Sequence, residues 1–257
     1  MALQRLDFER RTIPDFEVSL ETTPHVVRAV GKPGFWNGIV YSHFPTSVAE
    51  AVITKEISHF AKLHRSFEWK VYSHDEPADL LVRLQDHGFN IGAEESLMIL
   101  DLQKLSPSLF ALDPEGIKVT AVASDEGIGH FLSLEAAIWG PQADTTRAFL
   151  QTALEDRFQG NRAFIAYSGA KPIGFGRVTV SEGSQFAGLW SGSVLPEFRG
   201  RGIYRALLAA RIQHARRFDS VRYFRVDALP TSRPILERYG FARLASTWPA
   251  NSPPTKS

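Results

Sequence analysis

One segment of the sequence combines residues suited to holding a phosphorylated ligand. From Ser193 to Leu208 it reads Ser-Val-Leu-Pro-Glu-Phe-Arg-Gly-Arg-Gly-Ile-Tyr-Arg-Ala-Leu-Leu, which predicts a strand end, a glycine-rich turn and a helix start. Backbone N–H groups in such a turn have no partner within the helix, and the positive end of the helix dipole favours anions. The segment therefore predicts an anion site built largely from backbone, and a pyrophosphate is the natural guest.

Glycine and arginine complete this predicted site. Gly200 and Gly202 let the chain turn and let a phosphate approach without a Cβ in the way. Arg199 and Arg201 add positive charge. The charge of the chain is uneven, because residues 1–103 carry a net −5 and the remainder a net +6. Such an excess favours an anionic partner, either nucleic acid or a phosphorylated cofactor.

The segment resembles the acyl-CoA-binding motif of the GCN5-related N-acetyltransferase (GNAT) superfamily, Arg/Gln-x-x-Gly-x-Gly/Ala. Here the motif reads Arg199-Gly-Arg-Gly202-Ile-Tyr204, and the tyrosine at the last position departs from the family pattern. The order of hairpin, strand, Val-x-Pro, motif, helix, strand, helix and Gly-Phe also follows the family. The resemblance covers about residues 115–247 and implies a mixed α/β fold with a mostly antiparallel sheet flanked by helices.

The resemblance implies that the chain transfers an acyl group, with acetyl-CoA as the expected donor, directly to an amine of a small molecule or peptide. A backbone N–H near Ser193–Leu195 would polarise the thioester carbonyl, while the motif holds the pyrophosphate. The implied cofactor contacts are Ser193, Val194, Leu195, Arg199, Gly200, Arg201, Gly202, Ile203, Tyr204 and Arg205. A non-catalytic acyl-CoA-binding sensor or scaffold is the alternative.

The groups that would move protons are less evident. Many family members place a tyrosine four residues before Gly-Phe to protonate the leaving thiolate, but here that residue is Leu236. Ser232 and Tyr239 are the alternatives for this acid, against structural roles as a helix cap and a packing residue. The strand before the motif has no glutamate to act as a base. The candidates for the base are Asp227, Glu135 and His130.

Hydrophobic periodicity predicts the elements that must position these residues. In the second half, the predicted strands are Ile117–Val122, Ala163–Tyr167, Ile173–Val180, Phe186–Leu195 and Val221–Ala228, followed by one last strand. The predicted helices are Glu126–Trp139, Thr145–Phe158, Ile203–Arg217 and Ser232–Tyr239. On the third of these helices, Arg211 falls within the apolar arc, so we expect it to be buried and paired with a carboxylate or a carbonyl.

The first half repeats part of this order. It predicts strands Ile39–His43, Phe67–Tyr72 and Glu95–Leu102, and helices Ser47–Leu63 and Pro77–His87. The interval from Pro45 to Gly88 matches that from Pro196 to Gly240 within one residue. This repetition predicts a tandem arrangement with a degenerate first copy, since no glycine or arginine follows Pro45 closely. The predicted divisions are 1–103, a linker 104–116, the acyltransferase domain 117–248 and a flexible tail 249–257.

Composition excludes several other classes. Cysteine is absent, which rules out disulfides and a thiol nucleophile, and no His or acidic cluster has metal-ligand spacing. No 18-residue apolar run and no apolar leader is present, so we expect a cytoplasmic protein without a membrane span. The arginine cluster lacks the interleaved aromatic residues of a nucleic-acid site, and no nucleic-acid partner is expected.

Overall fold

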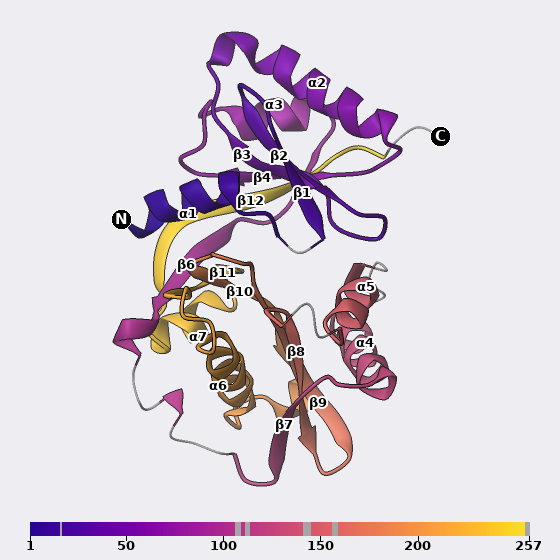
Figure 1. The fold of residues 1–257 in the computed structure, drawn as a ribbon, viewed down its shortest axis with the longest axis vertical. Coiled ribbons are helices and arrows are strands. Elements are labelled where there is room, and N and C mark those ends of the chain that lie inside the picture. The colour runs from indigo at the N-terminus through magenta and orange to yellow at the C-terminus, as the bar shows by residue number, and fades with distance from the viewer. Residues whose placement is uncertain (16, 106–108, 111–113, 141–144, 156–158, 255–257) are drawn as a thin grey trace. The chain divides into compact units, whose positions relative to one another are not determined.

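A computed structural model of the 257-residue chain describes residues 1–15, 17–105, 109–110, 114–140, 145–155 and 159–254 (Figure 1). The chain forms two compact units. The first contains Met1–Met98, Asp227–Glu237 and Ala242–Ser257, and the second contains Ile99–Val226 and Arg238–Phe241. Three elements carry residues of both units: strand β6 (Glu95–Asp101), strand β11 (Tyr223–Ala228) and helix α7 (Arg233–Arg238).

The sheet of the second unit is mixed. Its order is β7-β8-β9-β10-β11, with strands β7 (Ile117–Ala121), β8 (Arg162–Ser168), β9 (Lys171–Val180), β10 (Phe186–Val194) and β11 (Tyr223–Ala228). Neighbours are antiparallel except β10 and β11, which run parallel. The β8–β9 hairpin turns at Gly169, whose φ of 59° suits a residue without a Cβ. A parallel pair needs a crossover, and helix α6 (Ile203–Ala215) provides it here.

Helices cover both faces of this sheet. Helix α4 (Asp125–Trp139) begins at Ser124, whose side chain accepts a hydrogen bond from the Gly127 N–H, and α5 (Thr145–Thr152) follows it. Both pack over the face on which Phe175 lies, and a hydrophobic core forms between them and the sheet. Side chains alternate along a strand, so the neighbouring Gly176 faces the other side, where it meets Arg211 of α6. Figure 1 shows α4 and α6 on these two faces.

The first unit has its own mixed sheet, in the order β1-β2-β3-β4-β12, and β5 also pairs with β12. Its strands are β1 (Val18–Thr22), β2 (Val26–Gly31), β3 (Gly38–Ser42), β4 (Glu68–Tyr72), β5 (Asn90–Ile91) and β12 (Ala242–Asn251). Helices α2 (Ala49–Lys62) and α3 (Leu80–Asp86) pack on one face over a core that includes Trp69 and Phe60. Helix α1 (Ala2–Thr12) lies against Tyr72 on the other face, where the Arg10 guanidinium is 4.1 Å from its ring centroid.

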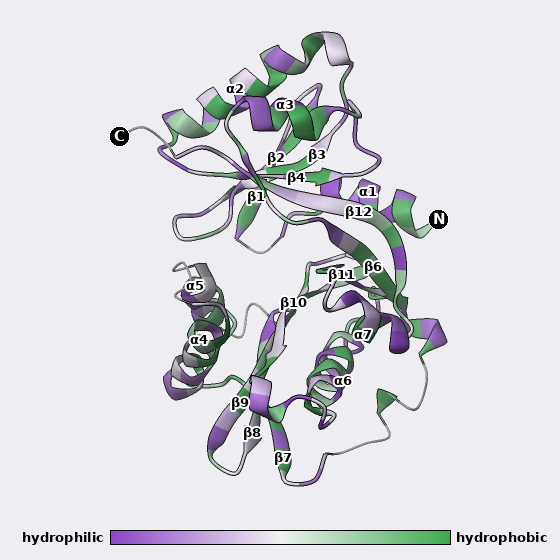
Figure 2. Ribbon diagram, turned by 180° about the vertical axis from the view of Figure 1, so that it is seen from behind, coloured by the Kyte–Doolittle hydropathy of each residue, from purple (hydrophilic) through white to green (hydrophobic). Residues whose placement is uncertain are grey.

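The predicted elements that flank the motif are present, with ends that differ by a few residues. Figure 2 shows hydrophobic and hydrophilic residues alternating along α2, whereas β12 is pale over most of its length. The sequence reading missed α1, β1, β2 and β5. The sequence does not predict helix α1 because its residues have no apolar stripe, and Leu6 is its one buried apolar residue. Of the predicted helix Thr145–Phe158, residues 156–158 lie outside the described part of the chain.

The prediction of a flexible tail from Pro249 is wrong for its first residues. Strand β12 continues to Asn251, and Pro249 pairs with Lys70 of β4 in an antiparallel register. The Phe67 N–H then donates to the hydroxyl of Ser252 at 3.1 Å. A proline is tolerated in a strand where its missing N–H is not needed. The last strand belongs to the first unit, so the compact units differ from the predicted boundaries at residues 103 and 248.

Candidate active site

The turn before α6 exposes a set of unpaired backbone donors. A short 3-10 helix, Pro196–Phe198, follows β10, and residues 199–202 separate it from α6. Gly200 and Gly202 have φ of 76° and 78°, in the left-handed region that favours glycine. None of the N–H groups from Gly200 to Arg205 donates a hydrogen bond to the described part of the protein, and the first to do so is that of Ala206, to the Gly202 carbonyl.

The surroundings of this turn fit a diphosphate. A Cβ added at Gly200 would meet no atom within 4 Å, so the space above the turn is open. The Arg205 side chain folds back over Gly202, where a Cβ would lie 3.6 Å from its Nη2. Arg199 is anchored by a hydrogen bond from Nε to the Val194 carbonyl at 3.1 Å, and Arg201 is exposed. Free N–H groups at a helix start, together with nearby guanidinium groups, are the donor set that phosphate oxygens accept from.

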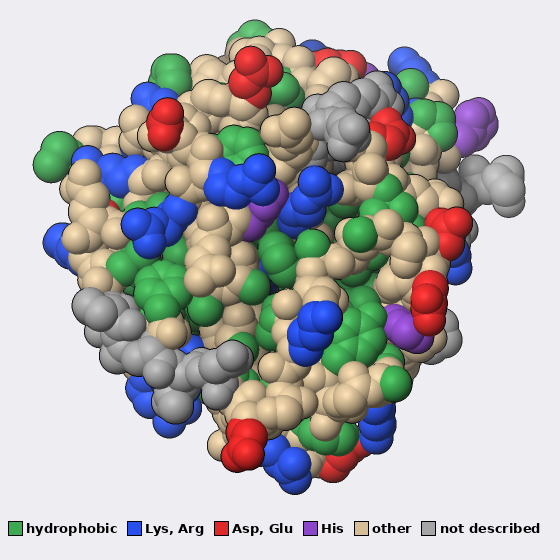
Figure 3. All heavy atoms as spheres, turned by 60° about the horizontal axis from the view of Figure 1, so that its bottom comes forward, with side chains coloured by type: hydrophobic (Ala, Val, Ile, Leu, Met, Phe, Trp, Pro, Cys, Tyr) green, Lys and Arg blue, Asp and Glu red, His purple; other side chains and the backbone are tan. Residues whose placement is uncertain are grey.

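Lys171 is a positive residue beside the turn that the sequence reading missed. Its Nζ lies 5.0 Å from the Phe198 ring centroid and 3.5 Å from a Glu197 carboxylate oxygen. Lys171 is the first residue of β9. The Leu195 N–H donates to the Ile173 carbonyl, and this hydrogen bond holds the turn next to the β8–β9 hairpin. The register of the two strands around Val-x-Pro was the signal that would have revealed it. Figure 3 shows one face of the protein, on which Lys and Arg side chains gather near the middle.

Strand β10 has one edge that β11 covers only in part. The parallel register runs from Phe186↔Tyr223 to Gly188↔Arg225, whereas β10 continues to Val194. Beyond this point β10 bulges: Ser191 has φ of 53°, and the register with β9 shifts between Trp190 and Ser193. Since the Leu195 N–H points toward β9, alternation turns the Val194 N–H toward the uncovered edge. Of the predicted thioester contacts, Val194 is therefore the free donor, and Leu195 is not.

The structure brings one of the three catalytic candidates next to the motif. The ring of Tyr239 stacks on that of Tyr204 in the first turn of α6, with centroids 6.5 Å apart and an interplanar angle of 23°. Its hydroxyl makes no hydrogen bond to the described residues. Tyr204, the residue that departs from the family pattern, thus has a ring partner.

The other two candidates have protein partners. Asp227 forms an ion pair with Lys70 Nζ at 3.1 Å, and the same ammonium bonds to Glu95 at 2.6 Å. Its carboxylate is therefore already neutralised by a cation. The Ser232 hydroxyl donates to the Leu229 carbonyl at 3.1 Å, and the Ser232 carbonyl accepts from the Leu236 N–H. Ser232 thus has a position at the start of α7 that fits a capping role.

Arg211 is buried, as predicted. Its side chain is 1% exposed and donates from Nε to the Leu207 carbonyl at 3.1 Å. Its guanidinium carbon lies 5.7 Å from the Tyr204 ring centroid, and Nη2 has no hydrogen-bond partner. Gly176 and Gly192 make room for it, because a Cβ at either would come within 3.1 Å of the guanidinium. Burial lowers the pKa of Arg211 from its usual value. The partner is a carbonyl and not a carboxylate.

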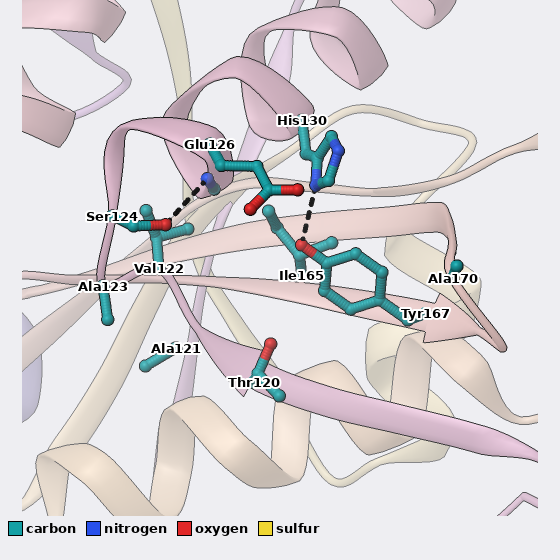
Figure 4. Close-up of a pocket in the computed structure, with 11 residues that line it drawn as sticks. Thr120, Ala121, Val122, Ala123, Ser124, Glu126, His130, Ile165, Tyr167 and Ala170 are labelled. Carbon is teal, nitrogen blue, oxygen red and sulfur yellow. Dashed lines mark hydrogen bonds between the residues drawn. The ribbon is translucent and has the colours of Figure 1, made fainter.

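The base candidate His130 lies in a separate pocket of about 340 Å³ (Figure 4). The pocket is lined by the end of β7, the start of α4 and part of β8. His130 Nδ1 and the Tyr167 hydroxyl are 3.1 Å apart. Burial, followed by the charge of Glu126, raises the pKa of Tyr167. None of the motif residues lines this pocket.

The base candidate Glu135 lies on the α4 side of the sheet. It is 3% exposed, and its Oε1 accepts a long hydrogen bond of 3.4 Å from the Thr146 hydroxyl. Its Oε2 has no hydrogen-bond partner. Burial raises its pKa, although the positive charge of Arg177 opposes the shift.

Comparison with known proteins agrees with this fold. Residues 119–251 match the family model described as an acetyltransferase (GNAT) domain. This match spans more than half of the chain, and the chain belongs to the GNAT acetyltransferase family. A search of curated proteins found no match.

Solved structures with the same fold match over almost the full length. A GCN5-related N-acetyltransferase from Kribbella flavida has a TM-score of 0.64 and 16% identity, covering 98% of this chain and 93% of that one. A conserved protein of unknown function from Staphylococcus epidermidis has a TM-score of 0.67 and 14% identity, covering 97% and 98%. A tandem GNAT protein of the clavulanic acid pathway has a TM-score of 0.58 and 15% identity, covering 98% and 89%. No helix in the described residues is long and apolar enough to cross a membrane.

Proposed function

We propose that this protein is an acyl-CoA-dependent N-acyltransferase that uses acetyl-CoA and transfers the acyl group directly to an amine. The observation that carries the proposal is the run of unpaired N–H groups from Gly200 to Arg205 at the start of α6. The N–H groups of such a run can donate to the diphosphate oxygens of CoA without a side-chain rearrangement. Arg199, Arg201 and Arg205 add charge beside it, and Lys171 extends this positive group.

The uncovered edge of β10 supports the proposal for the acyl end. Pantetheine would lie along this edge, and the Val194 N–H would donate to the thioester oxygen, where negative charge develops in the transition state. In the reaction the amine nitrogen bonds to the carbonyl carbon, the C–S bond breaks, and the electron pair leaves with sulfur. The amine loses one proton and the thiolate gains one. Tyr239, whose ring stacks on that of Tyr204 in the first turn of α6, is the proposed donor to the thiolate.

We also propose that the first unit is a degenerate GNAT-like copy that does not hold CoA. The proposal is supported by the order of strand, proline, 3-10 helix, α-helix, parallel strand, helix and glycine that residues 38–88 and residues 186–240 share. In the first unit the 3-10 helix Thr46–Val48 leads directly into α2, with no glycine turn between them. That arrangement leaves no open loop for a diphosphate.

Calorimetry and a turnover assay test the main proposal. The protein should bind CoA with one site per chain and release free thiol from acetyl-CoA in the presence of an acceptor amine. The double variant Gly200→Glu, Gly202→Glu places two carboxylates in the turn and should abolish both. Retention of CoA affinity in that variant would refute the site. Binding of CoA without turnover on any of a broad panel of amines would favour the non-catalytic sensor.

A further inference from the structure

A buried charge pair lies on the α4 face of the second unit, outside the acyl-CoA contacts. Glu135 belongs to the stripe of α4 that faces β9, since Phe131 and Trp139, four residues to either side, both contact the ring of Phe175. Arg177 lies two residues further along β9, on the same face, and its guanidinium carbon is 4.7 Å from the Phe149 ring centroid. The two charges therefore lie between α4, α5 and the sheet.

Among the described residues, the pair is only partly satisfied by hydrogen bonds. Glu135 Oε2 and Arg177 Nε are buried, and neither has a hydrogen-bond partner. The charges act on each other, but no hydrogen bond or ion pair joins them among the described residues. The terminal nitrogens of Arg177 make no hydrogen bond to the described chain, yet they are not among the atoms sealed from solvent. A buried acceptor and an accessible fork of donors thus lie near each other without partners.

The position of this pair connects it to the acyl site. In the register of β9 with β10, Arg177 is opposite Trp190, one residue before the bulge that begins at Ser191. Paired residues of antiparallel strands project on the same face, so Trp190 and Ser193 lie on the α4 face with Arg177 and Phe175. The uncovered end of β10, where the thioester is proposed to lie, is thus next to the unsatisfied charges.

We propose that Glu135 and Arg177 bind the acceptor, and that the acceptor is an amine that also carries a carboxylate, as an amino acid does. A planar guanidinium binds a carboxylate through two parallel N–H···O bonds, and a buried carboxylate oxygen accepts from an ammonium group. A ligand with both groups satisfies both residues at once, whereas a plain amine leaves Arg177 unpaired. This inference rests on the proposed function and names the substrate class of that site.

The aromatic residues around the pair fit the non-polar part of such a molecule. Trp139 is 46% exposed although its ring contacts Phe175, and Trp190 is half-buried with its Nε1 donating to Thr179 at 2.9 Å. Burial lowers the pKa of Arg177 to about 10, which still leaves the guanidinium charged at neutral pH. An apolar wall beside a charged anchor favours acceptors with an apolar side chain.

The test compares acceptors that differ only in the carboxylate. The twenty amino acids and their C-terminal amides are assayed with acetyl-CoA by thiol release, and the ratio of kcat/KM between each acid and its amide is measured. The wild-type ratio for the best acceptor should be about 30 or more, the value of one charge-assisted bidentate contact. In Arg177→Gln the ratio should fall to near one, with Arg177→Lys in between. Glu135→Gln should raise KM for both members of each pair.

Arg216→Gln is the matched control, because Arg216 is an exposed arginine of the same unit at the end of α6. It should keep the wild-type ratio. CoA calorimetry on each variant separates misfolding from loss of acceptor binding. Turnover that is equal for acids and amides, or a ratio unchanged in Arg177→Gln, would overturn the inference while leaving the acyltransferase proposal intact. Absence of CoA binding would overturn both, and CoA binding without turnover on any member of the panel would also overturn the acceptor assignment.

Discussion

The stretches Pro45–Gly88 and Pro196–Gly240 have the same framework and differ in how the first helix begins. In each, a strand leads through proline into a 3-10 helix and an α-helix, and the next strand pairs in parallel with the first. Each ends in a glycine of positive φ, at 82° for Gly88 and 90° for Gly240, followed by a buried phenylalanine. The same framework therefore forms whether or not a glycine turn precedes the first helix.

The difference lies in four residues. Residues 199–202 separate the 3-10 helix from α6 in the second stretch, whereas Val48 is followed at once by Ala49 of α2 in the first. The first turn of α2 also carries Glu50, whose carboxylate bonds to Arg83 and His87 at 2.7 Å each. A carboxylate at a helix start is itself an anion at the positive end of the dipole. We therefore expect anion binding to depend on the inserted turn and not on the helix alone.

A second difference is the treatment of a buried charge on each helix. Glu56 of α2 is 1% exposed and is met by Arg28 of β2, with one contact of 2.9 Å between Arg28 Nη2 and Glu56 Oε1. Arg211 of α6 is equally buried, but Gly176 of β9 lies against it and no carboxylate meets it. The buried charge on α2 thus has an oppositely charged partner, whereas the buried charge on α6 has none among the described residues.

The largest effect on CoA binding is expected when the two glycines of the turn are replaced with alanine. The double variant Gly200→Ala, Gly202→Ala should weaken CoA binding by about 100-fold, roughly 2.7 kcal/mol, because Cβ atoms crowd the diphosphate and disfavour the left-handed backbone. Gly183→Ala is the matched control, since Gly183 has φ of 74° and equally open space. It should share the strain in thermal unfolding and keep the affinity. If Gly183→Ala lost as much CoA affinity as the double variant, the turn at Gly200 and Gly202 would have no special role in binding CoA.

The two buried charges should respond in opposite ways. Glu56→Ala leaves Arg28 buried without its main partner and should cost about 3 kcal/mol in the free energy of unfolding. Arg211→Met removes a charge that has no carboxylate partner and should be neutral or stabilising by about 1 kcal/mol. Urea unfolding of both variants at neutral pH measures this. A large loss of unfolding free energy in Arg211→Met would show that the buried guanidinium stabilises the fold even without a carboxylate partner.

The histidines of the two helices sharpen the comparison through pH. His214 is 7% exposed between aromatic rings, and burial lowers its pKa to about 4. The unfolded chain, with a histidine pKa near 6.5, binds the extra proton between these values, so stability falls as pH drops from about 6.5 to about 4. From pH 7 to pH 5 the loss from this residue should be about 1 kcal/mol after solvent screening.

The variant His214→Phe should flatten this pH dependence in thermal unfolding. His59 in α2 serves as the control, because Glu21 lies 3.5 Å from its Nε2, and His59→Phe should leave the dependence in place. A wild-type protein equally stable at both pH values would contradict the role given to His214.

The smallest effect is expected at the start of α2. Glu50→Gln removes the negative charge there while keeping the side-chain length. Because no turn of free N–H groups precedes α2, the variant should gain no affinity for CoA by calorimetry. A second CoA site in Glu50→Gln would show that the carboxylate, and not the missing turn, keeps the first unit empty.

Much of this fold followed from local patterns. The motif, the hairpin and the helix α6 were readable because glycine, proline and apolar spacing mark them within a few residues. A last strand was predicted as well, but its place in the first unit was not, since that depends on pairing with β4, about 180 residues away in the chain. Strands β1 and β2 lack clear alternation, and the sequence does not predict them.

The sequence predicts the part of the candidate site that is made of backbone. The cradle around Gly200 and Gly202 follows from the sequence, but the state of each side chain depends on distant partners. Asp227 pairs with Lys70 from another strand, and the charges of Arg177 and Glu135 act on each other only because α4 packs on β9. No spacing along the chain contains these contacts.

Hydrogen exchange of the backbone amides tests the central claim most directly. With saturating CoA, amides from Gly200 to Arg205 should become protected, because each now donates to a phosphate or is shielded by it, while amides of residues 46–50 should exchange at an unchanged rate. Unchanged exchange at Gly200–Arg205 despite bound CoA, or protection that appears at residues 46–50 instead, would contradict the account.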